Sequence, residues 1–127
     1  MNRQIITTDS APAAIGPYSQ AIRAGNFLFI SGQLPMHPVS GKIVTGGIDA
    51  QSRQVLKNIA GILQAASLTP EHVVKATIFL KDLQDFSTVN AIYGEMFTHQ
   101  PPARECVEVA RLPRDAAIEI SVIAICA

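Results

Sequence analysis

Charged residues and a cysteine are concentrated in the stretch Pro102-Ala103-Arg104-Glu105-Cys106-Val107-Glu108-Val109-Ala110-Arg111-Leu112-Pro113. It places two guanidinium groups, a thiol and two carboxylates along one short segment. Alternate side chains of a strand share a face, so we expect Arg104, Cys106 and Glu108 to point the same way. The planar fork of arginine suits a fixed carboxylate or phosphate, which makes Arg104 a candidate anion site. The alternative is an exposed ion pair on an edge strand, and spacing alone favours that alternative.

The composition around this stretch predicts one domain spanning residues 1–127. The chain is 48% hydrophobic and 16% charged, which leaves few charges to cover its surface and favours an interface with another chain. Ten basic and ten acidic residues cancel, and no run of like charge is present. A binding surface for nucleic acid or anionic membrane is therefore not expected, and a small, locally recognised ligand fits better.

The cellular context is read from the first residues and from the thiols. No apolar signal core or membrane-spanning run is visible, so we expect a cytoplasmic protein. Cys106 and Cys126 lack metal-type spacing, which favours reduced thiols over a disulfide. The three histidines are scattered, so no metal site is expected.

The first third of the chain predicts three strands, at residues 3–7, 19–24 and 27–31. Gly25-Asn26 joins the second and third as a tight hairpin turn. Glycine and proline recur through residues 32–47, so this segment is expected to be a loop.

The remainder alternates helices and strands. Asp49 is expected to cap a helix that ends before Pro70, and residues 69–71 a single capped turn. Residues 73–80 form the next strand, with Val74 on the face of Ala76, Ile78 and Leu80. A second helix starts at Asp82 or Asp85, with Asn90 inside its apolar stripe, and residues 118–125 form the last strand after the 102–113 stretch.

This element order predicts an α+β fold with a six-stranded mixed sheet. Right-handed crossovers put both helices on the same face of the sheet. The other face stays uncovered and carries Phe79, Ile123 and Ile125 among polar groups. An exposed mixed sheet usually marks a protein interface, so we expect a homo-oligomer packed sheet to sheet.

Glu119 is the candidate for activating water. It interrupts an apolar strand on the face of Ser121 and Ile123, and it can lie near Arg104 if that face is the open one. The alternative is that Glu119 neutralises Arg104 or Arg111 across neighbouring strands.

Five further residues are candidates for a ligand cleft. Cys106 lacks a neighbouring base, so a pocket-lining thiol is favoured over a nucleophile. Asn90 is either a satisfied core amide or a ligand contact. Ser31-Gly32 ends a strand where glycine lets a ligand approach the backbone, although a turn alone would explain it. Tyr18 is held at a proline-glycine corner, where it either covers the pocket or packs the loop.

Several motifs resemble the RidA (YjgF) family. They are Ala14-Ile15-Gly16-Pro17-Tyr18-Ser19-Gln20-Ala21, Phe29-Ile30-Ser31-Gly32-Gln33-Leu34-Pro35, Lys75-Ala76-Thr77-Ile78-Phe79-Leu80-Lys81-Asp82, the 102–113 stretch, and Ile118-Glu119-Ile120. The resemblance covers nearly the whole chain, and the arginine-cysteine motif is that of the deaminase branch. Pro102, Glu105 and Ser121 depart from the residues usual in the family, which bears on substrate preference.

The resemblance implies a chorismate-mutase-like fold and a homotrimer with a central barrel and clefts between subunits. It implies hydrolysis of enamine and imine intermediates, such as 2-aminoacrylate and 2-aminocrotonate, to 2-oxo acids and ammonia, without a cofactor. Arg104 would hold the substrate carboxylate and Glu119 would position the water. The backbone at Gly32 and Cys106 would contact the ligand, and Tyr18, Ser31 and Asn90 would line the cleft. The alternatives are a non-catalytic trimer that binds 2-oxo acids and a ribonuclease or translation inhibitor, which the neutral charge disfavours.

Overall fold

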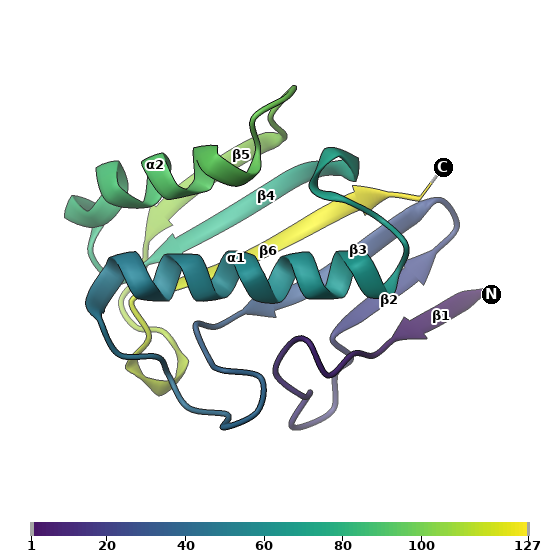
Figure 1. Ribbon diagram of the computed structural model, residues 1–127, viewed down its shortest axis with the longest axis horizontal. Coiled ribbons are helices and arrows are strands. Elements are labelled where there is room, and N and C mark those ends of the chain that lie inside the picture. The colour runs from purple at the N-terminus through teal and green to yellow at the C-terminus, as the bar shows by residue number, and fades with distance from the viewer. Residues whose placement is uncertain (1, 127) are drawn as a thin grey trace.

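The computed structural model describes residues 2–126, which form one six-stranded mixed sheet with two α-helices on a single face (Figure 1). Met1 and Ala127, the ends of the expected domain, lie outside the described residues. The strands are β1 (Arg3–Ile6), β2 (Ala21–Ala24), β3 (Phe27–Gln33), β4 (Val73–Leu80), β5 (Ala103–Glu108) and β6 (Ile118–Ile125). The helices are α1 (Gly47–Ala65) and α2 (Phe86–Met96), with single 3-10 turns at Pro70–His72, Leu83–Asp85 and Pro113–Asp115.

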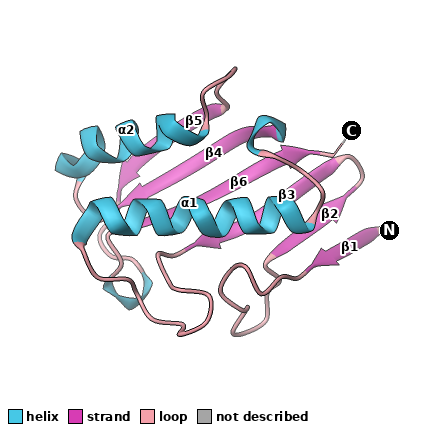
Figure 2. Cartoon of the chain, viewed as in Figure 1, coloured by secondary structure: helices cyan, strands magenta, loops and turns pink. Residues whose placement is uncertain are grey.

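The strands lie in the order β1-β2-β3-β6-β4-β5, as Figure 2 allows the reader to follow. Only β4 and β5 pair in parallel among the described strands, and β1 and β5 form the two edges. The predicted hairpin is confirmed: Gly25 has a φ of 58°, which glycine adopts without steric cost. The expected fold class, six strands with both helices on one face, is confirmed.

The core lies between the helices and the sheet. From α1, Val55, Ile59, Ile62 and Leu63 are fully buried and pack with Leu28, Ile78, Leu80, Ile118 and Ile120 of the strands. Burying each such side chain contributes roughly 1.5–3 kcal/mol, so this layer supplies most of the fold's stability. None of the helices in residues 2–126 combines the length and apolar character needed to cross a bilayer.

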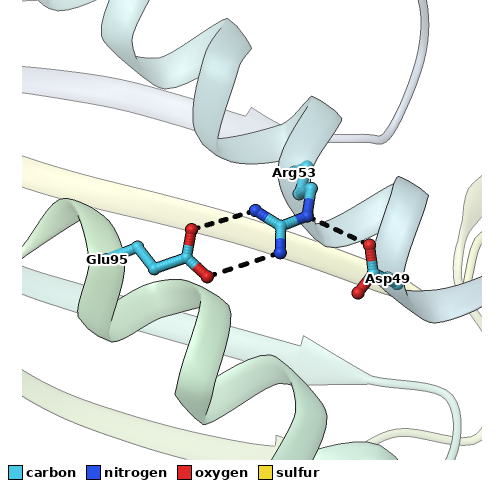
Figure 3. A network of polar contacts seen from close by, with 3 residues as sticks. All are labelled: Asp49, Arg53 and Glu95. Atoms are coloured by element: carbon cyan, nitrogen blue, oxygen red, sulfur yellow. Dashed lines mark hydrogen bonds and ion pairs between the residues drawn. The ribbon is translucent and has the colours of Figure 1, made fainter.

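On their solvent side the two helices are joined by an ion network, shown in Figure 3. The Arg53 guanidinium of α1 donates to Asp49 Oδ1 at 3.0 Å and to Glu95 Oε1 of α2 at 3.0 Å. These groups are exposed, so the network orients the helices and adds little stability.

The predicted start of the first helix is wrong. Gly46, with a φ of 115°, occupies the N-cap position, and Asp49 lies in the first turn. The Asp49 carboxylate accepts from the Arg53 side chain instead of from backbone amides. A glycine N-cap provides no side-chain acceptor, so nothing in the residue types marked this boundary.

The expected position of Val74 also needs correction, whereas Asp85, one of the two predicted starts of the second helix, is confirmed. Val74 is 38% exposed, because the β4–β6 pairing shifts between Val73 and Lys75 and turns Val73 inward instead. At the second helix, Asp82 Oδ1 accepts from the Gln84 amide at 2.9 Å and so caps the preceding 3-10 turn. Asp85 is then the N-cap of α2.

The face of the sheet opposite the helices is uncovered in this chain, as expected (Figure 1). Phe79, Ile123 and Ile125 lie on it and are half-buried. Four large apolar residues also lie there and are exposed by 43% to 62%: Ile5, Phe27, Phe29 and Val107. We call these seven residues the apolar open face.

Candidate functional site

Arg104 lies on edge strand β5, on the side of the sheet that carries the helices. Its register partner on β4 is Ala76, which is fully buried against the helices. The guanidinium donates from Nη1 to Asn90 Oδ1 of α2 at 2.8 Å. Its Cζ lies 4.8 Å from the ring centre of Tyr93 and 5.5 Å from that of Phe86. Arg104 therefore rests on an aromatic platform, with its orientation fixed by one amide.

Within residues 2–126 no carboxylate pairs with Arg104. Glu105 points to the open face, where its carboxylate accepts from Lys75 Nζ at 3.0 Å and from Thr77 Oγ1 at 3.1 Å. Glu108 Oε1 accepts from the backbone amide of Leu83 at 2.9 Å. The alternative of an intrachain ion pair is therefore wrong, and the Arg104 charge is available to an anion.

Two shallow cavities flank the aromatic platform. One has a volume of about 430 Å³ and is lined by Asn90, Tyr93, Gly94, Phe97, Pro101, Pro102 and Arg104. The other, of about 540 Å³, is lined by Leu83, Gln84, Phe86, Ser87 and Cys106. Arg104 and Cys106 thus open onto neighbouring hollows, each large enough for a small organic acid.

Cys106 does not have the surroundings of a nucleophile. Burial raises the pKa of its thiol, and the nearby Arg104 offsets this only in part. Cys106 and Cys126 are both free, and neither forms a disulfide within residues 2–126. A protonated, half-buried thiol is a pocket-lining group.

Glu119 lies on the opposite face of the sheet from Arg104. Its register partner is Phe79, which in turn aligns with Val107 on the open side of β5. Burial raises the pKa of the Glu119 carboxyl. Glu119 has no ion pair or hydrogen bond among residues 2–126, so it does not neutralise Arg104 or Arg111 in this chain.

Gly32 makes room for the Glu119 side chain. The β3–β6 pairing is irregular between Ile30 and Gln33, and Glu119 crosses over the gap. A Cβ at residue 32 would lie 2.5 Å from Glu119 Oε2 and 2.9 Å from its Cδ. A larger residue at position 32 would therefore require the Glu119 carboxylate to shift.

Ser31 and Tyr18 lie where β3 meets the loop that precedes β2. Ser31 Oγ donates to the Ser19 carbonyl at 2.6 Å and so ties β3 to the loop before β2. Tyr18 is 54% exposed in that loop, and its hydroxyl accepts from the Ile15 amide at 3.3 Å. The Tyr18 ring is therefore presented to solvent instead of packing in the core.

The predicted site residues thus form two groups. Asn90, Arg104 and Cys106 lie at the β5 edge on the helix side, and Glu119 lies with Gly32 and Ser31 on the open side. Glu119 lies on the open face, as expected. Within one chain it does not lie near Arg104, so that part of the expectation is wrong. Glu119 pairs with Phe79 of β4 and faces the open side, whereas Arg104 pairs with the buried Ala76 and faces the helices.

The sequence alone did not single out Phe86 and Tyr93, whose rings lie against Arg104. The Tyr93 hydroxyl is buried without a hydrogen-bond partner among the described residues, and burial raises the pKa of Tyr93, although Arg104 lowers it in part. The available signal was their spacing around Asn90, which puts the two rings and the amide on one side of α2.

Comparison with known proteins gives the class. A family model described as Endoribonuclease L-PSP matches residues 8–126. The chain belongs to this family, the RidA (YjgF) family whose motifs the sequence carries.

Individual relatives match over nearly their full length. A RutC family protein of Pyrococcus horikoshii is 54% identical, over 96% of this chain and 97% of the relative. An Escherichia coli protein named 2-iminobutanoate/2-iminopropanoate deaminase is 51% identical, over 94% and 95%. Among solved structures, the Rid family protein YyfA of Yersinia pestis has a TM-score of 0.95 at 46% identity, covering 98% of this chain and 99% of its own. Escherichia coli TdcF, solved with bound serine, has a TM-score of 0.90 at 44% identity, covering 96% and 98%.

Proposed function

We propose that this protein hydrolyses reactive enamine and imine intermediates, such as 2-aminoacrylate and 2-aminocrotonate, to 2-oxo acids and ammonia. The main support for this proposal is the surroundings of Arg104. Its guanidinium contacts the Asn90 amide and the rings of Tyr93 and Phe86, and no carboxylate of residues 2–126 pairs with it. The name of the Escherichia coli relative supports the reaction class. A cytoplasmic location fits the two free thiols.

Arg104 is proposed to hold the substrate carboxylate. A bidentate pair with guanidinium is both strong and orienting when partly shielded from water, as it is above the Tyr93 and Phe86 rings. Serine, the ligand bound to the related TdcF, is a small amino acid and so also carries a carboxylate. The backbone at Cys106, two residues along the same strand, is within range of the rest of such a ligand.

Glu119 is proposed to position and activate the water. As the water oxygen adds to the imine carbon, Glu119 takes one proton from it, and this proton is then passed to the nitrogen of the carbinolamine. A second proton then moves from the carbinolamine hydroxyl to this nitrogen through the Glu119 carboxylate, so that the C–N bond breaks, ammonia leaves and the C=O group of the 2-oxo acid forms. The raised pKa of Glu119 suits a general base, and one such group supplies roughly 10² to 10⁴ in rate.

The two groups act together only if they come from different copies of the chain. Arg104 and Glu119 lie on opposite faces of one sheet, and the apolar open face needs a partner surface. We propose a homotrimer in which the open faces form a central barrel. Its intersubunit clefts would be lined by Tyr18, Ser31, Gly32, Asn90 and Cys106.

A coupled assay tests the proposal. A pyridoxal-phosphate dehydratase generates the imine in situ, and release of the 2-oxo acid is followed with and without the protein. The wild type should accelerate release and Arg104→Ala should abolish the acceleration, because the carboxylate loses its anchor. Equal rates for the two proteins would refute the role of Arg104.

Two other functions would give different results. A non-catalytic binding protein would bind a 2-oxo acid by calorimetry yet leave imine decay unchanged. A ribonuclease, the activity in the family description, would cleave RNA in a manner that survives Arg104→Ala. The zero net charge gives no support to the RNA alternative.

A further inference from the structure

The Asn90 side chain forms a hydrogen bond with Arg104 and with no other side chain among residues 2–126. It lies on α2 one turn before Tyr93, and its Oδ1 accepts from Arg104 Nη1 at 2.8 Å. We propose that Asn90 is a positioning residue whose neutral amide oxygen aims Arg104 at the substrate carboxylate without consuming its charge. This inference rests on the proposed function, in which Arg104 is the carboxylate anchor.

The contacts of Arg104 leave one edge of the guanidinium open. A guanidinium group carries five N–H donors. In Arg104 only Nη1 donates to Asn90. Neither Nε nor Nη2 has a partner among the described residues. The rings of Tyr93 and Phe86 lie against the guanidinium at 4.8 and 5.5 Å and restrict its tilt. Arginine is flexible along its stem, so these three contacts together select one orientation.

The neutrality of the surroundings is the feature that matters. Every group that touches the guanidinium in the described chain is uncharged, because burial keeps the phenol of Tyr93 protonated and Asn90 is an amide. The acidic neighbours in sequence, Glu105 and Glu108, are engaged elsewhere by Lys75 and by the Leu83 amide. An aspartate at residue 90 would have nearly the same shape and accept the same bond. It would also pair with Arg104 and compete with the substrate.

The test compares Asn90→Asp, Asn90→Ala and a matched control, Thr88→Asp. Thr88 is exposed on α2, two residues from Asn90 and so on the other side of the helix, and it receives the same charge. Coupled-assay kinetics give KM and kcat, and calorimetry with 2-oxobutanoate gives the affinity directly.

We expect Asn90→Ala to raise KM by about tenfold with kcat nearly unchanged, since one charge-assisted hydrogen bond is lost. Asn90→Asp should weaken 2-oxobutanoate binding by about 100-fold or more, because its carboxylate occupies the arginine. Thr88→Asp should stay within about twofold of the wild type, since exposed charges at that range act weakly. Binding by Asn90→Asp that equals the wild type, or that equals Asn90→Ala, would overturn the inference.

Thermal unfolding of each variant checks that it folds. If Asn90→Asp does not fold, Asn90→Gln provides the second comparison, because it keeps a neutral carbonyl oxygen near Nη1. It should bind more tightly than Asn90→Ala, and binding no better than the alanine variant would overturn the inference. A wild type that binds 2-oxobutanoate but does not accelerate imine hydrolysis would refute the deaminase, and the affinity series would still decide the role of Asn90.

Discussion

Arg104 and Glu119 are set apart from the other charged residues of the chain by what surrounds them. The four ion pairs among residues 2–126 use other side chains, all of them substantially exposed. Arg104 has only neutral partners, and Glu119 has burial without a partner. A charge left unpaired inside a folded chain costs stability, so such placements indicate function.

The pKa of Glu119 leads to a prediction for Glu119→Gln. Because burial raises this pKa, the folded chain binds the proton more tightly than the unfolded chain, and ionisation above the ordinary glutamate pKa costs stability. Glu119→Gln should therefore raise Tm at pH 7 while abolishing hydrolysis. The Tm difference should shrink as the pH falls toward 4, where Glu119 is protonated. A variant that is less stable than the wild type at pH 7 would contradict this.

Cys106 gives a contrasting prediction. With its thiol pKa raised by burial, Cys106 is protonated at neutral pH and contributes only backbone and shape. Cys106→Ala should keep kcat/KM within about threefold of the wild type, as expected for a residue that makes no bond in the transition state. Cys126→Ala serves as the control. A loss of 100-fold or more in Cys106→Ala alone would restore the nucleophile hypothesis.

At the residue scale, the sequence identified candidate site residues but did not predict the contacts between them. The residue type of Arg104 and the place of Asn90 in an apolar helical stripe make both residues candidates. The 2.8 Å hydrogen bond between them joins α2 to β5, and no local sequence pattern predicts that contact. The ion-pair alternative for Arg104 failed because Glu105 is turned to Lys75 on the other face. Such choices depend on register, which packing determines.

At the scale of elements, the helix glycines Gly61 and Gly94 differ in their surroundings. Packing requires a glycine at one of these positions but not at the other. Gly61 of α1 faces the loop before β2, and a Cβ there would lie 2.7 Å from the Ser10 carbonyl oxygen. Gly94 of α2 has nothing within 4 Å of the same position. The helix α1 therefore requires glycine for close approach, whereas α2 does not.

Urea unfolding of Gly61→Ala and Gly94→Ala tests this difference. Gly94→Ala should raise the free energy of unfolding by about 0.5–1 kcal/mol through helix propensity. Gly61→Ala should lower it by about 1–3 kcal/mol, because the overpacked contact is with backbone. Stabilisation by both substitutions would show that the loop moves away freely.

Most element assignments followed from periodicity, because amphipathic helices and strands carry their own signal. The two expectations that failed have different causes, one in a residue type and one in strand pairing. The N-cap of α1 is a glycine, which leaves no side-chain mark. Val74 is displaced by a register shift in the pairing of β4 with β6, and such a shift reflects a distant strand.

At the scale of the whole molecule, the sheet separates the candidate site into two halves. The helix side carries Arg104 with its aromatic platform, and the open side carries Glu119 over Gly32 beside the apolar open face. The sequence predicted an uncovered face, but not that the two key residues lie on opposite sides of the sheet. That fact follows only from how β5 and β6 both align with β4.

In the proposed homotrimer, Arg104 of one copy would work with Glu119 of another. The most direct measurement mixes the inactive variants Arg104→Ala and Glu119→Gln, unfolds and refolds them together, and assays imine hydrolysis. Random trimers should contain clefts with both native residues in roughly a quarter of cases, so about a quarter of wild-type activity should return. Mixed trimers without any regained activity would contradict the account.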